Sequence, residues 1–193
     1  MLRLMKITEE ELVRRCNQKD ARAQKLLYDT YHSRLLGICL RYGKSKAEAE
    51  DILQMGMVRI FKYMSTFSGN GSFEGWMKRI MVNVAIDNFR KNTKHYYHED
   101  ITEVKGVPAQ EDDATGNIAV KDILASVQQL PPGYRIVFNL YAIEGFSHNE
   151  IAEKLGISVN TSKTQLLKAR RNLMKKLTDM NQLPTKAYAQ NEG

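Results

Sequence analysis

Basic side chains gather on the last long helical segment of this 193-residue chain, and their spacing suits contact with nucleic acid. No acidic residue interrupts positions 159–178. Side chains three and four residues apart share one face of a helix, so cations here can reach base edges near the start of the helix and phosphates further along. A solvated basic face on an ordinary helix is the alternative. The candidates for base-edge contact are Lys163, Thr164, Leu167 and Lys168.

A second polar face recurs at steps of three and four between positions 76 and 91. Amides and guanidinium groups hydrogen-bond base edges, and an aromatic ring can stack on an unpaired base. A Gly- and Ser-rich loop, positions 67–72, comes directly before it. A core tryptophan below a solvated polar face would give the same pattern, and that alternative stays open. The residues of this face are Trp76, Arg79, Asn83, Asp87, Arg90 and Lys91.

Two residue pairs have the chemistry of a catalytic or metal site, but each is incomplete. Glu48 and Asp51 form a possible carboxylate pair, and His95 and His98 lie three residues apart. Neither pair has the third ligand or the oriented nucleophile that such chemistry requires. No Gly-rich phosphate-binding motif is present either. We therefore predict that the chain is not an enzyme and uses no metal and no cofactor.

Helices must position these residues, because helix signals recur along the chain and no convincing strand alternation appears. Capping boxes begin at Thr8, Ser45 and Ser147. Gly56, inside a helical segment, indicates close packing against a neighbour. A short turn at 156–158 between two helices predicts a helix-turn-helix unit. One expected helix follows Asp20 and ends at Gly43. The helices after it are expected at about 46–64, 73–92, 118–129, 134–141, 147–155 and 159–178.

Charge divides the chain into three segments. Positions 1–97 hold 18 basic and 10 acidic residues, positions 98–117 hold one and six, and positions 118–193 hold ten and six. The formal net charge is +7, and basic domains favour polyanions. The pattern predicts an all-α protein with two small helical domains, 1–92 and 118–180. A flexible acidic linker at 93–117 joins them, and a polar tail at 181–193 follows.

Several protein classes are excluded by composition. No run of eighteen apolar residues exists, so we expect no membrane insertion. The first residues lack the apolar core of a secretory signal. Cys16 and Cys39 cannot build a disulfide scaffold, which fits reduced thiols and a cytoplasmic location.

Two stretches of the chain together resemble one protein family. Positions 49–54 (AEDILQ) and 76–91 (WMKRIMVNVAIDNFRK) look like region 2 of the extracytoplasmic-function sigma factors, within the sigma-70 family. Positions 130–132 (LPP), 145–158 (GFSHNEIAEKLGIS) and 161–170 resemble their region 4. The resemblance covers about positions 20–178 in collinear order. It implies a transcription initiation factor that directs core RNA polymerase to promoters and catalyses nothing itself.

The resemblance also implies roles for single residues. Asp51 and Gln54 would face the polymerase clamp, while other family contacts reach the flap. Region 2 would melt the −10 element, with an extruded base held by Asn83 and the loop Phe67–Phe73. The residues implied at the −10 DNA are Phe67, Asn70, Phe73, Trp76, Arg79, Asn83, Arg90 and Lys91. Those implied at the −35 groove are Lys163, Thr164, Leu167, Lys168 and Arg171.

Partners follow from the same resemblance: core polymerase, promoter DNA and, commonly in the family, an anti-sigma factor. Bound to polymerase, the chain would associate with the nucleoid. Met55, Met57 and Ser162 depart from the residues that many members carry.

A conventional operator-binding regulator is the rival class of protein, and it should bind a duplex site without polymerase. A pure protein adaptor would leave the basic helix unexplained.

Overall fold

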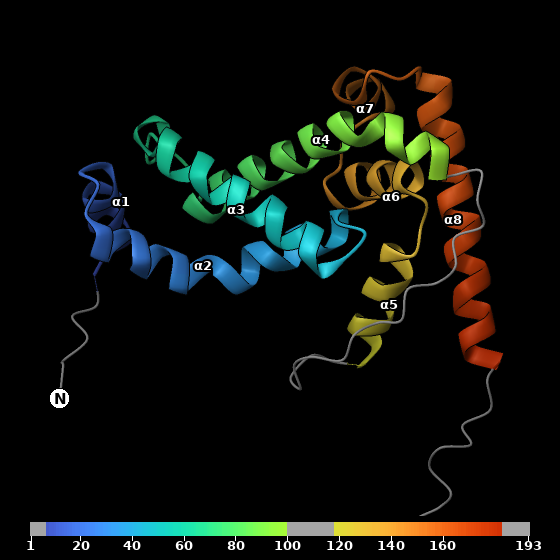
Figure 1. Cartoon of the computed structure of the whole chain (residues 1–193), viewed down its shortest axis with the longest axis horizontal. Helices are drawn as coiled ribbons and strands as arrows, with labels where there is room; N and C mark the ends of the chain where they lie inside the picture. Colours follow the sequence, from blue (N-terminus) through green and yellow to red (C-terminus); the bar gives the residue numbers. More distant parts are fainter. Residues whose placement is uncertain (1–6, 100–117, 183–193) are drawn as a thin grey trace, which may run out of the picture. The chain divides into compact units, whose positions relative to one another are not determined.

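Every regular element in residues 7–99 and 118–182, the part of the chain that the computed structural model describes, is a helix. The chain divides into two compact units, residues 1–97 and 98–193 (Figure 1). The prediction of two small all-helical domains is thereby confirmed. The acidic linker was expected at 93–117, and its residues 100–117 lie outside the described ranges, as does the tail from residue 183.

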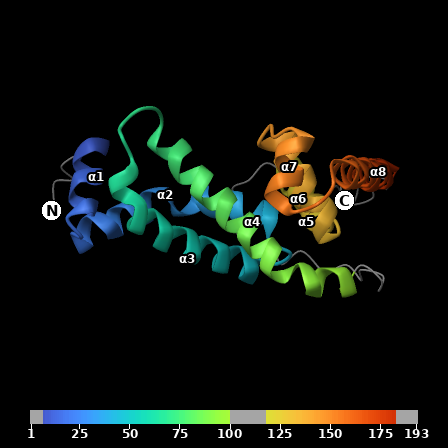
Figure 2. The same ribbon diagram turned by 90° about the horizontal axis from the view of Figure 1, so that it is seen from above.

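The first unit consists of α1 (Glu9–Asn17), α2 (Ala21–Tyr42), α3 (Lys46–Tyr63), the short 3₁₀ turn η1 (Met64–Thr66) and α4 (Phe73–Glu99). α2 packs against both α1 and α3. The chain reverses through the loop 67–72, so α4 runs back along α3 (Figures 1 and 2). α4 extends seven residues past its expected end at Asn92. No Gly or Pro occurs between positions 93 and 99, so nothing in the sequence there breaks a helix.

The helix starts follow the capping signals, although only one capping box is complete. Thr8 Oγ1 accepts a hydrogen bond from the Glu11 amide, and Ser45 Oγ accepts one from the Glu48 amide. The Glu11 carboxylate, however, pairs with Arg14 rather than returning to the cap. Only Ser147 and Glu150 bond reciprocally, with the Ser147 amide 2.7 Å from Glu150 Oε2. The sequence motif therefore locates a helix start without fixing what its carboxylate binds.

The core of the first unit contains sulfur-bearing side chains, and at one point two of its helices pack unusually closely. A Cβ on Gly56 would lie 2.1 Å from Sδ of Met81, so α3 and α4 meet where α3 has no side chain. This confirms the close packing predicted at Gly56. Cys39 lies in the same core, with Sγ 4.0 Å from the Met81 sulfur, and burial raises its thiol pKa to about 12. Both cysteines are free and buried, and the Cys39 thiol is therefore uncharged at neutral pH.

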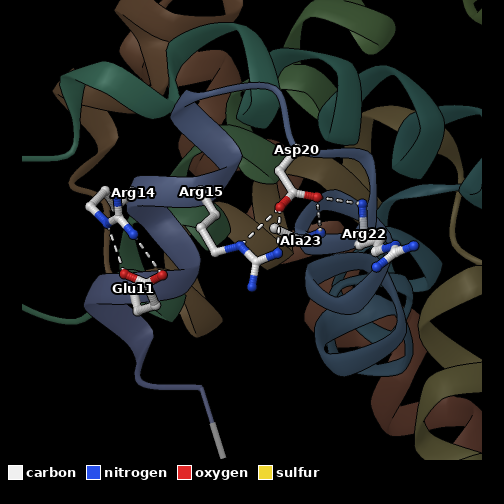
Figure 3. Close-up of polar contacts among 6 residues, drawn as sticks. All are labelled: Glu11, Arg14, Arg15, Asp20, Arg22 and Ala23. Carbon is white, nitrogen blue, oxygen red and sulfur yellow. Dashed lines mark hydrogen bonds and ion pairs between the residues drawn. The ribbon is translucent and has the colours of Figure 1, made fainter. Parts of the chain in front are cut away.

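A single carboxylate forms the corner between α1 and α2. Asp20 accepts hydrogen bonds from the amides of Arg22 and Ala23, at 2.8 and 3.2 Å, which caps α2 (Figure 3). The same side chain bonds Nε of Arg15, the partner contributed by α1, at 2.9 Å. The hydrogen bond from Arg15, followed by those from the backbone, holds the Asp20 pKa below its ordinary value.

The second unit consists of α5 (Ile118–Gln128), α6 (Pro132–Phe138), the π-helical turn η2 (Asn139–Ile143), α7 (His148–Leu155) and α8 (Val159–Gln182). Helices α5, α6 and α7 all pack on α8. Pro132 is the first residue of α6 and Pro131 is its N-cap, because a proline lacks the amide that the first turn cannot use. The buried Arg135 donates to the carbonyls of Gln128 and Leu130, at 2.8 and 3.3 Å, and thereby ties α6 to the end of α5.

Candidate nucleic-acid interface

The first half of α8 presents an exposed polar and basic face. All five residues expected there are exposed, and Leu167 retains half of its accessible surface. The opposite side is buried through Leu166 and Ala169. We call the exposed set the α8 reading face, and it consists of Lys163, Thr164, Leu167, Lys168 and Arg171.

Local sequence signals fix where α8 begins and how it meets the preceding helix. Gly156 ends α7 in the left-handed conformation, with φ +68°, and the Ile157 amide donates to the Ala152 carbonyl at 3.1 Å. Ser158 then caps α8, since its Oγ accepts a hydrogen bond from the Thr161 amide at 3.0 Å. This geometry is a helix-turn-helix, as predicted. A Cβ on Gly133 would lie 3.0 Å from Nε2 of Gln165, so α6 approaches α8 closely as well.

Some cationic side chains of α8 contact neighbouring groups: two lie over tyrosine rings, and one donates a hydrogen bond to a glutamine side chain. The Lys168 ammonium lies 5.8 Å from the Tyr134 ring centre, and the Arg170 guanidinium lies 5.7 Å from that of Tyr141. Both side chains remain exposed. Lys176 instead turns toward the residue that follows α5, where its Nζ donates to Gln129 Oε1 at 2.8 Å, and burial lowers its pKa. Lys176 therefore already has a partner within the second unit, and its contact with phosphate stays a prediction.

The polar face of α4 is exposed at the positions that could touch nucleic acid. Arg79, Asn83, Arg90 and Lys91 are exposed, and so are all residues of the loop 68–72. Asp87, in contrast, pairs with Arg59 at 2.7 Å and joins α4 to α3. We call the exposed side chains with the loop the α4 face. Gly69 and Gly71 have φ values of +76° and +93°, which lets the loop turn tightly.

Three aromatic rings pack beneath this loop. Phe73 and Trp76 stack with their ring centres 5.7 Å apart and their planes 12° apart, and Phe67 tilts against both. Phe67 and Trp76 are half-buried, whereas Phe73 is fully buried and meets Tyr31 edge-on. The expected contact between Phe73 and DNA is therefore corrected, because this ring belongs to the core. Asn70 lies exposed at the loop tip.

The expected polymerase surface on α3 is exposed and partly apolar. Asp51 and Gln54 are both exposed and lie one turn apart. Met55 and Val58 retain 37% and 67% of their accessible surface on the same helix. Glu48 does not form a catalytic pair with Asp51, because its carboxylate accepts hydrogen bonds from the Lys44 amide and from Nδ2 of Asn88.

Asn160 is a further candidate that the motifs of the sequence did not indicate. This residue is exposed in the first turn of α8, three and four positions before Lys163 and Thr164, so it extends the α8 reading face by one turn. An Asn can bond adenine through two hydrogen bonds. The same spacing argument that selected Lys163 would have found it.

Two other kinds of site are absent from the described part of the chain. Within residues 7–99 and 118–182, no group of three His, Cys, Asp or Glu side chains could hold a metal ion. In the same part of the chain, no helix has the length and apolarity needed to cross a bilayer.

Family models match both units. The model described as Sigma-70 region 2 matches residues 27–95, and the model described as Sigma-70, region 4 matches residues 121–173. The first match contains α3 with most of α2 and α4, and the second contains the helix-turn-helix.

Individual proteins agree with these models. The chain is 32% identical to the ECF RNA polymerase sigma factor SigX of Bacillus subtilis over 149 residues, which covers 72% of this chain and 76% of the relative. It is 28% identical to SigW of the same organism, over 91% of this chain and 100% of the relative. The sigma factor RpoE from Bartonella quintana, solved in complex with the anti-sigma factor NepR, shares the fold with a TM-score of 0.50 at 20% identity, covering 80% and 96% of the two chains. This chain belongs to the extracytoplasmic-function sigma factors of the sigma-70 family, which direct RNA polymerase to promoters.

Proposed function

We propose that this sigma factor opens the −10 element with the α4 face and reads the −35 element with the α8 reading face. The exposed Asp51 and Gln54 dock on the polymerase clamp, and the second unit approaches the flap. The chain supplies binding and base capture rather than catalysis, and it acts in the cytoplasm, where the polymerase transcribes. An anti-sigma factor stays a prediction of the family resemblance.

One observation carries the −10 part of the proposal. Asn83 is exposed on α4 while the rings of Phe73 and Trp76 anchor the start of that helix, below a loop that two left-handed glycines shape. An amide both donates and accepts hydrogen bonds, so it can replace the pairing that an extruded base loses. Flipping a base costs a few kcal/mol, and a fixed amide beside a loop can offset part of that cost.

Asn83→Ala is expected to slow open-complex formation on duplex promoters about fivefold, because one hydrogen-bonded base contact contributes roughly 1 kcal/mol. The loss should be smaller on templates whose −10 segment is already unpaired, since the opening cost is then absent. Open complexes would be followed by permanganate footprinting with reconstituted holoenzyme. Asn17→Ala, which removes an exposed amide from α1, is the matched control. An equal loss on duplex and unpaired templates would contradict a role in melting.

Lys163→Ala should change which −35 base is preferred, because a base-edge contact discriminates by about 1–3 kcal/mol. Lys175→Ala removes an equally exposed cation further along α8 and should weaken binding to all sequences alike, with a salt slope reduced by about one. Competition among −35 variants on holoenzyme measures both effects. Unchanged preference in Lys163→Ala would show that this side chain does not reach the bases.

A further inference from the structure

Three elements of the second unit meet at the imidazole of His148. This residue opens α7, and its ring stacks on Tyr141 of η2 with the ring centres 4.6 Å apart and the planes 23° apart. Its Nδ1 lies 2.9 Å from Oγ of Ser162, a fully buried residue in the first turns of α8. The serine that departs from the family pattern therefore has a specific partner, and the imidazole links α7, η2 and the start of α8.

Two cations of α8 act on this imidazole. Burial lowers the pKa of His148, and the charges of Lys163 and Arg170 lower it further. Arg170 also lies over the outer partner of the stack, Tyr141. On α7 itself, the nearest carboxylate in sequence, Glu150, is engaged in capping Ser147. The free chain thus favours the neutral ring, because burial and the charges of Lys163 and Arg170 all act against an imidazolium.

We propose that His148 is a positioning residue of the α8 reading face, and that DNA binding by the second unit is coupled to protonation of its ring. The inference rests on the proposed −35 function, since that function places DNA against α8. When phosphates approach, they offset the charges of Lys163 and Arg170 that oppose an imidazolium. The bound state therefore holds the proton more tightly, and by linkage the affinity for DNA rises as the pH falls.

Protonation does not need to break the link to α8. The charged ring carries a proton on Nδ1 and can donate it to Ser162 Oγ, whereas the neutral ring can share the same hydrogen bond in either tautomer. Folding responds to the ring in the opposite direction. Because the pKa of His148 is lower in the folded chain than in the unfolded chain, the neutral ring stabilises the fold above the ordinary imidazole pKa of about 6.5. This stabilisation is lost as the pH falls through the pKa of the folded chain. A purely structural role thus predicts weaker DNA binding in mild acid, and coupling predicts stronger binding.

The test uses the full chain in holoenzyme and a fluorescent 20-base-pair duplex, selected by that holoenzyme from random sequence. Dissociation constants would be measured by anisotropy between pH 5.5 and 8.0 at constant ionic strength. We expect wild-type affinity to rise about three- to tenfold as the pH falls from 7.5 to 5.5, which requires the pKa of the ring to rise on binding by at least about a half to one. His148→Gln should remove this rise. His32→Gln is the matched control, because His32 also packs on a tyrosine, Tyr28, but belongs to the first unit.

The positioning role of His148 is tested at pH 8.0, where its ring is neutral. His148→Gln retains a group that can bond Ser162 and should bind within about twofold of wild type, whereas His148→Ala should bind several-fold more weakly. The same pH dependence in His148→Gln as in wild type would overturn the coupling, as would weaker wild-type binding in acid. If Lys163→Ala still alters base preference in that case, the −35 function stands and only this inference fails. If Lys163→Ala alters nothing, both fail.

Discussion

Replacing Phe73 by alanine is expected to lower the free energy of unfolding of the first unit by about 3–5 kcal/mol, because the substitution empties a fully buried aromatic site. The ring fills the space between Tyr31 and Trp76, so few neighbours can collapse into the cavity. Urea unfolding measures the loss. Trp76, the one tryptophan of the chain, reports on this unit by its fluorescence.

Phe67→Ala is the matched control for this substitution. It removes the same ring from the same cluster, but Phe67 is only half-buried, so we expect less than half the loss. A loss below about 1 kcal/mol for Phe73→Ala would mean that the ring leaves the core readily in solution. In that event Phe73 would return to the set of residues available to DNA.

Gly56→Ala and Gly37→Ala should have opposite effects although both place a methyl group inside a helix. At Gly56 the new carbon would lie 2.1 Å from Sδ and 2.7 Å from Cε of Met81, which is itself fully buried. We expect a loss of about 1–3 kcal/mol from overpacking. At Gly37 nothing lies within 4 Å, so the higher helix propensity of alanine should stabilise α2 by about 0.5–1 kcal/mol.

The same urea titration compares the two glycine variants, and a double-mutant cycle tests the cause. Met81→Val removes the sulfur that the new methyl group meets, so Gly56→Ala should cost less in that background, with a coupling of at least about 1 kcal/mol. Additive effects, or stabilisation by Gly56→Ala, would contradict close packing between α3 and α4.

Local signals in the sequence predicted most helix starts and the helix-turn-helix, because caps and turns depend on neighbouring residues. Asp20, Ser147 and Gly156 act in the structure as their types predict. Features that depend on distant residues were missed. The burial of Phe73, for example, follows from the ring of Tyr31 on α2.

In the candidate site, too, features set by local sequence were predictable and contacts between separate elements were not. Exposure of the α8 reading face follows from helical spacing, so the sequence predicted every member of it except Asn160. Lys176 shares that helix, but its partner Gln129 follows the end of α5, and spacing along one helix cannot reveal contacts with another segment. The link between His148 and Ser162 spans 14 residues, so spacing along α8 cannot predict it, although Ser162 departs from the family pattern.

The corner at Asp20 makes α1 an acid-labile attachment. One carboxylate both caps α2 and holds Arg15, so a single protonation weakens the start of one helix and the docking of another together. Since its pKa is depressed, both contributions persist at neutral pH and disappear as the pH falls through the lowered value. α1, which the buried Leu12 and Cys16 still hold, should then open more often as one segment, and the Cys16 thiol should react faster with a thiol reagent while the remaining helices stay folded.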